Sequence, residues 1–413
     1  MNKSTPEKKG SLTVAQARSA VLDMLIPISG WERVALRAAL DRVLAADVVA
    51  TFDVPAHDNS AMDGYAVRFA DLKADAASEL VVVGTALAGK AYAGTLGSGE
   101  AVRIMTGAVI PRGADMVVMQ EVVTASADRI AIPPGQKVGA NLRRTGEDLA
   151  RGRTVLSAGT RIGPAELGLL ASLGCAEISV RRRLRVAFFS TGDEVATIGQ
   201  ALAPGEVYDS NRYTLYGALS RLGVDLFDMG VVRDDPQEME QAFQVAAAQA
   251  DVILTTGGVS VGDADYVKDM MARMGEVKFW KLDIKPGRPM AFGRLGDTWL
   301  FGLPGNPVAV MVTYYQIVVD ALQKLMGVDP LPPRVAFPVV ADVDIRKAPG
   351  RREFPRGFVY QEQGVWRVRL AGNQGSGVLR SMAEANCFIV LPEERGNVAA
   401  GENVDVQMFA GLI

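Results

Sequence analysis

Between Leu184 and Gly327 apolar strands alternate with amphipathic helices, and this alternation constrains the fold of the 413-residue chain more than any other feature. A pattern of this kind predicts a doubly wound α/β domain, in which helices cover both faces of a parallel sheet. Ligands of such sheets bind beyond the carboxyl ends of the strands, so the loops after the strands are where function is expected. Strands are predicted at 184–190, 226–232, 252–256, 278–284 and 299–303, and helices are predicted to begin near Ser210, Asp235, Asp263 and Asn306.

Two β-rich regions flank this alternation. Between Leu80 and Ile132, short apolar runs separated by glycine predict a separate β domain with strands at 80–83, 102–105, 116–119 and 130–132. After a proline-rich joint at 330–333, short strands at 335–340, 365–370, 387–391 and 404–408 are separated by Gly-rich turns. This C-terminal pattern is typical of a small β-barrel or sandwich.

Helices are also expected on both sides of the first β region. Thr13 is a suitable N-cap for a helix that ends before Pro27, a second helix is predicted over Leu36–Leu44, and a third runs from Pro164 to Gly174. We expect the third helix to pack on the first, which would build one domain from two separated segments. The predicted division of the chain is 11–57 together with 146–182, then 58–145, 183–329 and 330–413.

Composition excludes several classes of function. The 44 basic and 47 acidic residues leave a net charge of −3, which provides no electrostatic footprint for nucleic acid. The single histidine, His57, and the two cysteines, Cys175 and Cys387, are too few for a structural zinc site, an iron–sulfur cluster or a Ser–His–Asp triad. The longest apolar run, Val308–Val319, is too short to cross a bilayer, and the polar N-terminus lacks a secretory signal. We therefore expect a cytoplasmic protein that binds neither membrane nor nucleic acid.

The loop after the third α/β strand, Thr255–Asp265, is the most informative segment of the chain. Backbone N–H groups of glycines in such a loop can approach an anion closely, and a helix start beyond it offers the positive end of its dipole. The loop is interpreted as a phosphate cradle, with an ordinary strand-to-helix turn as the alternative. Its candidate ligand-binding residues are Gly257, Gly258, Ser260 and Gly262.

A second turn follows a strand of the same sheet. It consists of Pro304, Gly305, Asn306 and Pro307, with Asn306 at the N-cap and Pro307 opening the helix. Alone it is equally well explained as an ordinary turn between a strand and a helix, with no role in binding. Together with the Gly loop and with Thr191–Glu194, it would converge on one crevice.

Carboxylates occupy the same loops: Asp193, Glu194, Asp234, Asp235, Asp263 and Asp265. They would repel a phosphate unless a cation neutralised them, and hard oxygen ligands suit Mg²⁺ held jointly with a substrate phosphate. The alternative is helix capping. We favour a cap for Asp235 and a functional role for Asp234 and Asp265.

Cations follow on the strand nearest these loops. Lys281 and Lys285 alternate with Leu282 and Ile284 and so share one face of an extended strand, and Arg288 lies just beyond. They would bind an oxyanion. The alternative is that the lysines are solvated guards of an edge strand.

The first β region contains two further candidate loops. Residues 58–65, which include Asp63, concentrate turn residues without apolar periodicity, as either a functional loop or a cluster of Asx turns. Farther on, Arg143 and Arg144 adjoin Glu147 and Asp148, so their guanidinium groups would either clasp a phosphate or pair with these carboxylates. We expect His57 to be a turn or interface side chain rather than a catalyst.

Nine segments occur in the order found in one known family. They are DNSAMDGYAV, RIMTGA, RRTGEDL, STGDE, VYDSNR, RDDP, TTGGVSVGDADY, FWKLDIKPGRPMAFG and GLPGNPVAV. In these segments the chain resembles the molybdopterin molybdenumtransferases, the MoeA and gephyrin E-domain family, from about Val14 to Phe409. Position 263 departs from the pattern, because many members carry Glu or Ser where this chain has Asp.

The resemblance implies a Mg²⁺-dependent reaction in which molybdate is inserted into the dithiolene of adenylated molybdopterin and AMP is released. It implies an elongated homodimer of four-domain subunits, made of an elongated dimerisation domain, a β-rich lid, a molybdopterin-binding α/β domain like that of MogA, and a C-terminal β-barrel. The active cleft would lie between the α/β domain of one subunit and the lid of the other. Transient contacts with other proteins of cofactor biosynthesis are also implied.

The resemblance also implies roles for individual residues. Glu194, Asp234 and Asp265 are expected at the Mg²⁺ and the phosphates, and Lys281 and Lys285 at the anionic ends of the substrate. The lid would contribute Asp63 and Thr106, with Arg143 and Asp148 close by. Pro304 and Pro307 would shape the loop on the molybdate side, and Ser376 would lie near molybdate.

Two rival functions remain open at this point. A molybdopterin adenylyltransferase shares the α/β domain, but it needs ATP and lacks the lid and the C-terminal β domain. A non-enzymatic scaffold, like the receptor-clustering side of gephyrin, requires additional partner-binding segments. Release of AMP from adenylated molybdopterin and molybdate would separate the first rival from the transferase.

Overall fold

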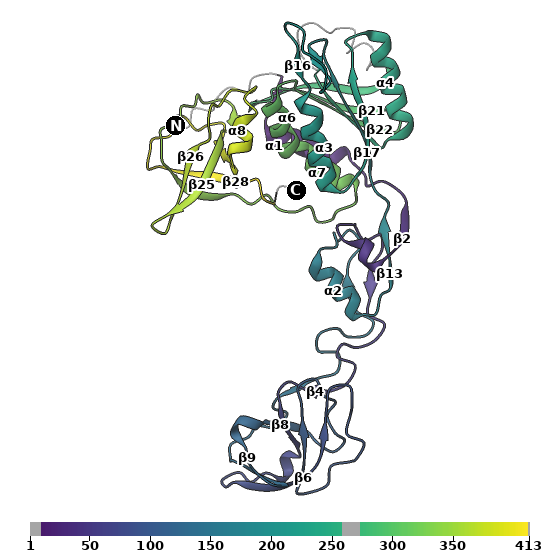
Figure 1. Cartoon of the computed structure of the whole chain (residues 1–413), viewed down its shortest axis with the longest axis vertical. Coiled ribbons are helices and arrows are strands. Elements are labelled where there is room, and N and C mark those ends of the chain that lie inside the picture. The colour runs from purple at the N-terminus through teal and green to yellow at the C-terminus, as the bar shows by residue number, and fades with distance from the viewer. Residues whose placement is uncertain (1–9, 258–272, 412–413) are drawn as a thin grey trace.

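The computed structural model of the chain describes residues 10–257 and 273–411. The molecule is elongated (Figure 1), with the α/β part and the C-terminal barrel side by side at one end and the lid at the other. A narrower part that contains α2, β2 and β13 joins them. The domain limits predicted from the sequence stay a prediction.

A seven-stranded sheet forms the α/β part, in the order β1-β19-β21-β22-β18-β14-β17. Its strands are β1 (Ser11–Leu12), β14 (Arg185–Thr191), β17 (Asp225–Val232), β18 (Val252–Thr256), β19 (Gly275–Leu282), β21 (Pro289–Leu295) and β22 (Thr298–Leu303). Its helices are α1 (Val14–Met24), α3 (Ser210–Leu222), α4 (Pro236–Gln249), α6 (Pro307–Thr313) and α7 (Val319–Leu325), with a π-helical turn at Tyr314–Val318 between the last two.

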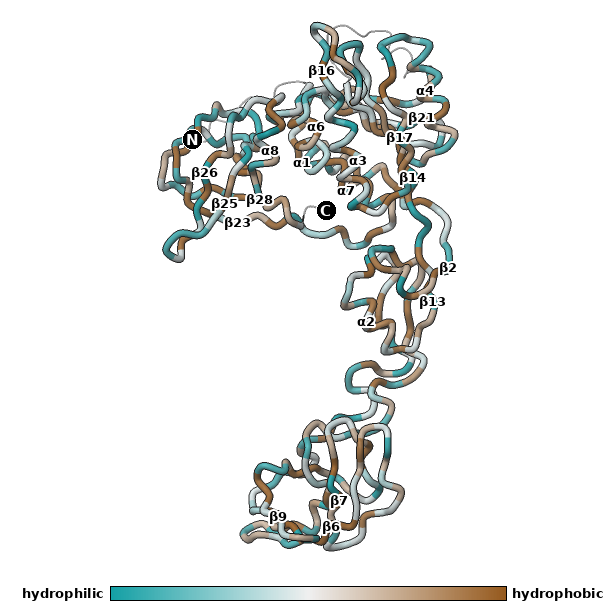
Figure 2. The backbone as a smooth tube through the Cα atoms, in the orientation of Figure 1, coloured by the Kyte–Doolittle hydropathy of each residue, from teal (hydrophilic) through white to brown (hydrophobic). Residues whose placement is uncertain are grey.

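Both faces of this sheet are buried, as the doubly wound prediction requires. Along β14, Val186 and Phe188 enter the hydrophobic core beneath α1, α3 and α7, whereas Ala187 and Phe189 enter a second core beneath α4. Successive side chains of a strand point to opposite faces, so one apolar strand supplies both cores. Figure 2 shows the hydrophobic stretches that meet where β14, β17 and α7 come together. The predicted fold class is confirmed.

The sheet contains two strands that were not predicted, β1 and β21, and β21 also interrupts the parallel order. Strands β17, β14, β18 and β22 are parallel, but β21 runs antiparallel to both of its neighbours, β22 and β19. The reason is a two-residue turn at Gly296-Asp297, since Leu295 pairs with Thr298 and so tight a connection makes a hairpin.

Helix α1 begins as predicted but packs elsewhere. Thr13 caps it, and Gln16 returns a hydrogen bond to the Thr13 N–H in a capping box. Its buried residues Val14, Ala17 and Val21 belong to the α/β core and do not contact α2. The prediction that the helix at 164–174 packs on this one is therefore wrong.

Two separated segments nevertheless form the connecting part. Strand β2 (Trp31–Ala35) pairs with β13 (Glu177–Arg181), β3 (Val48–Val49) pairs with β12 (Thr154–Leu156), and α2 (Pro164–Ser172) packs with a 3₁₀ turn (Leu36–Ala39). That turn replaces the helix predicted over Leu36–Leu44. The helix cannot continue because Asp41 has a φ of 63°, a left-handed conformation that ends a right-handed helix.

The lid is built on a six-stranded sheet in the order β8-β5-β7-β6-β10-β9. Its strands are β5 (Gly64–Val67), β6 (Ser78–Ala86), β7 (Glu100–Ile104), β8 (Met116–Met119), β9 (Thr124–Ser126) and β10 (Arg129–Ile132), with a separate pair β4 (Asn59–Ser60) and β11 (Leu142–Arg143) and 3₁₀ turns at Phe69–Asp71 and Gln120–Val122. The four strands predicted in this region are all present.

The C-terminal part is a closed barrel in the order β23-β26-β25-β27-β28, which decides between barrel and sandwich. Its elements are β23 (Phe337–Ala341), β25 (Arg356–Glu362), β26 (Val365–Leu370), α8 (Arg380–Glu384), β27 (Cys387–Val390) and β28 (Asn403–Met408). A two-residue strand before the barrel, β24 (Arg352–Glu353), pairs in parallel with β20 (Ile284–Lys285) of the α/β part. This pairing ties the two parts together beside the carboxyl end of the sheet.

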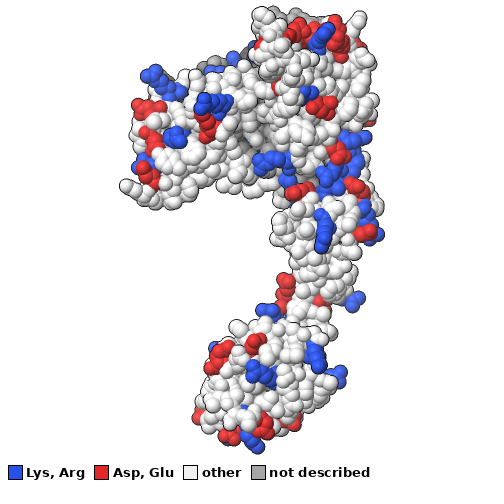
Figure 3. Space-filling model, in the orientation of Figure 1, with Lys and Arg blue, Asp and Glu red and all other residues white. Residues whose placement is uncertain are grey.

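The surface shows no large region of one charge on the face drawn in Figure 3, where basic and acidic side chains are interspersed on every part. Within residues 10–257 and 273–411, none of the helices combines the length and apolarity that crossing a bilayer requires.

Candidate active site

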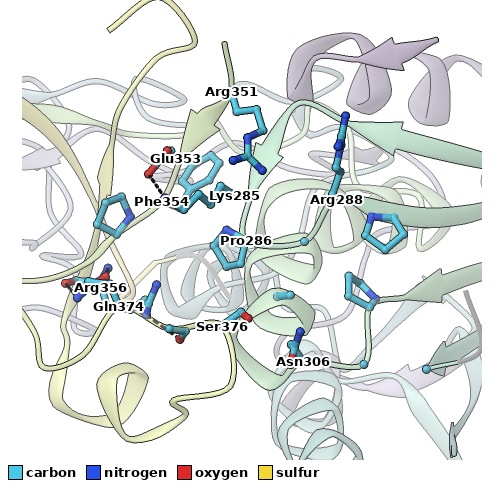
Figure 4. A pocket seen from close by; sticks show the side chains of 18 of the residues that line it. Lys285, Pro286, Arg288, Asn306, Arg351, Glu353, Phe354, Arg356, Gln374 and Ser376 are labelled. Atoms are coloured by element: carbon cyan, nitrogen blue, oxygen red, sulfur yellow. Dashed lines mark hydrogen bonds and ion pairs between the residues drawn. The ribbon is translucent and has the colours of Figure 1, made fainter. Parts of the chain in front are cut away.

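A cavity of about 920 Å³ lies where the carboxyl ends of β14, β18 and β22 face the barrel. From the α/β part, the residues that line it include Thr191, Glu194, Asp234, Gly257, Lys285, Arg288, Pro304, Gly305 and Asn306. From the C-terminal part they include Arg346, Arg351, Glu353, Phe354, Arg356, Gln374 and Ser376. Figure 4 shows side chains of both parts around one space. Nine of the predicted site residues are therefore brought together: Glu194, Asp234, Gly257, Lys285, Arg288, Pro304, Gly305, Asn306 and Ser376.

The described part of the Gly loop depends on glycine at 257. Gly257 has a φ of +85°, and a Cβ there would lie 2.3 Å from the carbonyl oxygen of Thr191. Glycine thus lets β18 end against β14 at the wall of the cavity. Gly258, Ser260, Gly262 and Asp265 lie outside the described residues, as does Asp263.

The Pro304–Pro307 turn is held from two sides. Asn211 donates from Nδ2 to the carbonyl of Gly305 at 2.6 Å. Asn306 occupies the N-cap position but its side chain makes no capping hydrogen bond; the N–H of Val308 instead donates to the carbonyl of Ser376 at 3.1 Å. The barrel loop therefore takes the place of the cap and brings Ser376 to the cavity.

Acidic side chains gather at one edge. The N–H of Asp234 donates to Asp193 Oδ1 at 3.3 Å, and Glu194 is close enough for its charge to act on Asp234. Burial, together with the negative charges of Asp193 and Glu194, raises the pKa of the Asp234 carboxyl above its ordinary value. Asp235 instead accepts from the N–H groups of Gln237 and Glu238, so the capping interpretation of that residue is confirmed.

Only one of the two predicted lysines reaches the cavity. Lys285 lies in the wall and pairs with Glu353 of β24 at 3.0 Å. Lys281 is exposed on β19, opposite Pro289 of β21 and Ser11 of β1, and does not line the cavity. Pro307 also lies just outside the lining residues.

Arg356 is a cavity residue that was not predicted from the sequence. It is 1% exposed, and it donates from Nε to Ser381 Oγ at 3.0 Å and from Nη2 to the carbonyls of Asn373 and Gly375 at 3.3 and 3.1 Å. Burial lowers the pKa of this guanidinium to about 10. In the part of the chain that the structure describes, no carboxylate pairs with it. A buried cation held by neutral groups at a cavity wall is suited to bind an anion.

The arginines of the C-terminal part had a signal in the sequence. Five basic residues lie within the short stretch 346–356, for which no site residue was predicted: Arg346, Lys347, Arg351, Arg352 and Arg356. A cluster of basic residues in a loop-rich segment indicates a surface that can bind an anion, so this cluster could have been predicted from the sequence.

The lid residues lie far from this cavity in the same chain (Figure 1). Asp63 accepts hydrogen bonds from the N–H and the Oγ1 of Thr106, both at 2.7 Å, and these hydrogen bonds lower its pKa. Arg144 pairs with Asp58 at 2.8 Å, and its N–H donates to Glu147. Arg143 and Asp148 are exposed nearby. The structure groups these residues on the lid but does not bring them to the cavity.

Three family models match the chain in succession: the MoeA N-terminal region (domain I and II) over residues 12–174, a probable molybdopterin binding domain over 187–324, and the MoeA C-terminal region (domain IV) over 338–409. A molybdopterin molybdenumtransferase of Haemophilus influenzae is 45% identical over 404 residues, which cover 97% of this chain and 100% of that relative. The chain belongs to the molybdopterin molybdenumtransferase family. It is therefore an enzyme of molybdenum-cofactor biosynthesis, which confirms the expected family and excludes the purely non-enzymatic scaffold.

Other members of this family agree. A molybdopterin molybdenumtransferase of Nostoc is 37% identical, with 90% of this chain and 87% of the relative covered. A crystal structure of the molybdopterin biosynthesis moeA protein from Pyrococcus horikoshii matches with a TM-score of 0.82 at 30% identity, over 97% of this chain and 100% of that one. The match extends over the lid and the barrel, which a related α/β protein without these parts would not give.

Proposed function

We propose that the cavity binds molybdate and adenylated molybdopterin together and inserts molybdenum into the dithiolene with release of AMP. The observation that carries this proposal is the composition of the cavity wall: Lys285, Arg288 and Arg356 share one space with the carboxylates of Glu194 and Asp234. Two anionic substrates require cations, whereas carboxylates beside phosphates require a metal ion between them.

Arg356 and Ser376 are proposed to hold molybdate. Three observations support this assignment: Arg356 is buried, it donates hydrogen bonds to neutral groups, and Ser376 lies in the same cavity wall. The protein needs no thiolate ligand for molybdenum, because the substrate's dithiolene provides the sulfur atoms. The two cysteines are consistent with this, since Cys387 is buried in the barrel core and Cys175 lies in the connecting part.

Mg²⁺ is proposed at the acidic edge. The donor set fits a hard cation, since Glu194 and Asp234 offer carboxylate oxygens, and burial together with the charges of Asp193 and Glu194 raises the pKa of Asp234. Within residues 10–257 and 273–411 no group of three His, Cys, Asp or Glu side chains is assembled for a metal, and Asp265 is the proposed third carboxylate. Bound there, Mg²⁺ would neutralise the charge of the substrate phosphates.

A homodimer is proposed because the lid and the cavity of one chain are far apart. Asp63, Thr106, Arg143 and Asp148 can act on a substrate in the cavity only if the lid of a second subunit reaches it. The Asp63 carboxylate is held by Thr106 with two hydrogen bonds, so it is already oriented for such a role. A cytoplasmic location and transient contacts with other proteins of cofactor biosynthesis stay predictions.

The reaction is tested by supplying the purified protein with adenylated molybdopterin, molybdate and Mg²⁺ and measuring AMP. Asp234→Asn should lower AMP release by roughly a hundredfold while the thermal unfolding midpoint stays close to that of the wild type. AMP formation only from ATP and free molybdopterin would instead support the adenylyltransferase. Undiminished release by Asp234→Asn would remove that carboxylate from the proposed metal site.

The shared site is tested by mixing two inactive variants, Asp63→Ala and Asp234→Ala, under conditions that allow subunit exchange. If each cavity uses the lid of the partner, the mixed dimer contains one site with both wild-type residues, and AMP release returns. Each variant alone is the control. A mixture that forms mixed dimers, verified by differently tagged subunits, yet stays inactive would refute a site between subunits.

A further inference from the structure

Two arginines reach the cavity from one loop of the C-terminal part, residues 344–351. Arg346 and Arg351 line the wall together with Arg288 of the α/β part, and all three side chains are exposed to the cavity or to solvent. Figure 4 shows Arg351 and Arg288 on one side of the cavity and Arg356, Gln374 and Ser376 on the other, with Lys285 and Pro286 between them. The labelled arginines therefore fall into two groups, and Arg346 belongs to the same loop as Arg351.

The arginine group Arg288, Arg346 and Arg351 differs in its partners from other arginines of the C-terminal part. Other arginines of the C-terminal part have carboxylate partners: Arg352 pairs with Glu393 at 3.1 Å, Arg367 with Asp342 at 3.1 Å, and Arg395 with Glu402 at 2.7 Å. In the described ranges of the chain, neither Arg346, Arg351 nor Arg288 has an ion-pair partner.

Two carboxylates of the C-terminal part, which line the same cavity, have other partners. Glu353 pairs with Lys285, and Asp344 accepts from the N–H of Ala400 at 2.8 Å. Among the described residues, neither of these carboxylates forms an ion pair with an arginine of this group.

The loop that carries the two arginines is held rigidly by a buried lysine. Lys347 is 5% exposed, and its Nζ donates to the carbonyl of Arg395 at 2.7 Å and to those of Glu393 and Ala348 at 3.4 Å. Main-chain hydrogen bonds add to this, since the N–H of Gly350 donates to the carbonyl of Glu393 at 2.7 Å and the N–H of Lys347 to Asn397 at 2.9 Å. A fixed backbone reduces the ordering cost when the arginines bind a ligand.

We propose that Arg288, Arg346 and Arg351 form a second anion subsite, separate from Arg356 and Ser376, which binds the phosphate groups of the organic substrate. This assignment rests on the proposed function, in which two different anions occupy the cavity at once. The volume of about 920 Å³ accommodates two ligands. Like charges at close range repel, so two separated cationic groups keep the oxyanion and the phosphates apart while both are bound.

Phosphate is the class of ligand that this group fits. A guanidinium presents a planar fork that donates two parallel hydrogen bonds to a tetrahedral oxyanion, and several forks can share one phosphoanhydride. In the proposed function the same phosphates would also contact Mg²⁺ at Glu194 and Asp234, which line the same cavity, but the guanidinium groups need no metal ion to bind them. Binding at the arginines should therefore persist without Mg²⁺.

The test is a binding measurement on the full chain in the presence of EDTA, with inorganic pyrophosphate and molybdate as separate probes. Arg351→Gln and Arg346→Gln should each weaken pyrophosphate binding about tenfold and change molybdate binding less than about twofold. Arg356→Met should do the reverse. Arg369→Gln is the matched control, because Arg369 lies over the Phe358 ring on the same barrel and outside the cavity.

Two results would overturn the subsite: an equal loss of both probes in Arg351→Gln and Arg346→Gln, or no loss of pyrophosphate binding in either. Thermal melts of each variant verify folding, which is expected to be retained because both side chains are exposed. The proposed function is judged separately. If the wild type binds pyrophosphate at these arginines but releases no AMP from the complete substrates, the transfer reaction fails while the subsite stands.

Discussion

Arg356 is a buried cation of the cavity wall, so replacing it by methionine tests whether its charge binds molybdate. The guanidinium is fully buried, and burial lowers its pKa to about 10, from an ordinary value of roughly 12.5 or above. One pH unit corresponds to ~1.4 kcal/mol, so keeping this group charged costs the free protein about 3 kcal/mol. A bound anion would recover that free energy.

Arg356→Met removes the charge and retains most of the volume. It relieves the cost of burying the charge, but it leaves Ser381 Oγ and the carbonyls of Asn373 and Gly375 without their donor. Losing the donor to a buried polar group costs about 1–3 kcal/mol, and Ser381 still donates to the carbonyl of Val378 at 2.7 Å. The two effects offset each other, so the free energy of unfolding without ligand should change by less than about 2 kcal/mol.

The assay is urea denaturation with and without molybdate. At a molybdate concentration of about 100 times its Kd, the wild type should gain about 2.7 kcal/mol, and Arg356→Met should gain almost none. Arg356→Lys keeps a positive charge but lacks the planar guanidinium group, so molybdate should raise its free energy of unfolding by an intermediate amount. The reasoning is refuted if Arg356→Met keeps the full molybdate-dependent gain. It is also refuted if the variant without ligand loses more than about 5 kcal/mol, because Arg356 would then act as a structural residue.

Three further predictions concern stability and the cavity wall. Burial opposes ionisation of Asp251, but hydrogen bonds from two arginines outweigh this effect and lower the pKa of its carboxyl to about 2. The contribution of Asp251 to stability is therefore present above about pH 4 and lost as the pH falls through 2. In urea denaturation, Asp251→Asn should lower the free energy of unfolding by about 2 kcal/mol at pH 7, and this difference should disappear near pH 2. Gly257→Ala should destabilise the protein by about 2 kcal/mol or more and weaken molybdate binding. Gly305→Ala should be tolerated, because the nearest atom to an added Cβ there is 3.8 Å away. Equal melting points of the two variants would contradict this expectation. Glu353→Gln removes the ion-pair partner of Lys285 and should strengthen pyrophosphate binding several-fold while lowering the free energy of unfolding by about 1 kcal/mol. Weaker pyrophosphate binding in a titration would show instead that the ion pair orients Lys285 for the ligand.

Local features of this protein follow well from its sequence. The capping box at Thr13, the four lid strands and the alternation between 184 and 303 involve residues within a turn or a strand of each other. Hydrophobic periodicity and turn chemistry are set by backbone geometry over such short ranges. The loops that carry Glu194, Asp234, Gly257 and Asn306 were located for the same reason, since strands that are parallel end at one edge of the sheet.

Errors arose where a distant part of the chain decided the outcome. Helix α1 has an apolar face that fits either α2 or the α/β core, and its periodicity does not specify which. The cut-off of the predicted 36–44 helix depends on a left-handed Asp41, a conformation that aspartate adopts more readily than most residues but that composition does not reveal. Lys281 and Lys285 were predicted to share one face of a single strand, but they belong to β19 and β20, and the pairing of β20 with β24 brings only Lys285 to the barrel.

By itself, the sequence determined the family, the α/β and β-rich segments, and the loops that line the cavity. The tertiary structure alone decided that Arg356 is buried at the cavity wall, that the lid stands away from the cavity of its own chain, and that the arginines form two groups. The physical reason is the range of the interactions. A strand or a turn is specified by neighbours in the chain, but the burial of a charge and the shape of a cavity depend on contacts such as that between Lys285 and Glu353, which lie 68 residues apart.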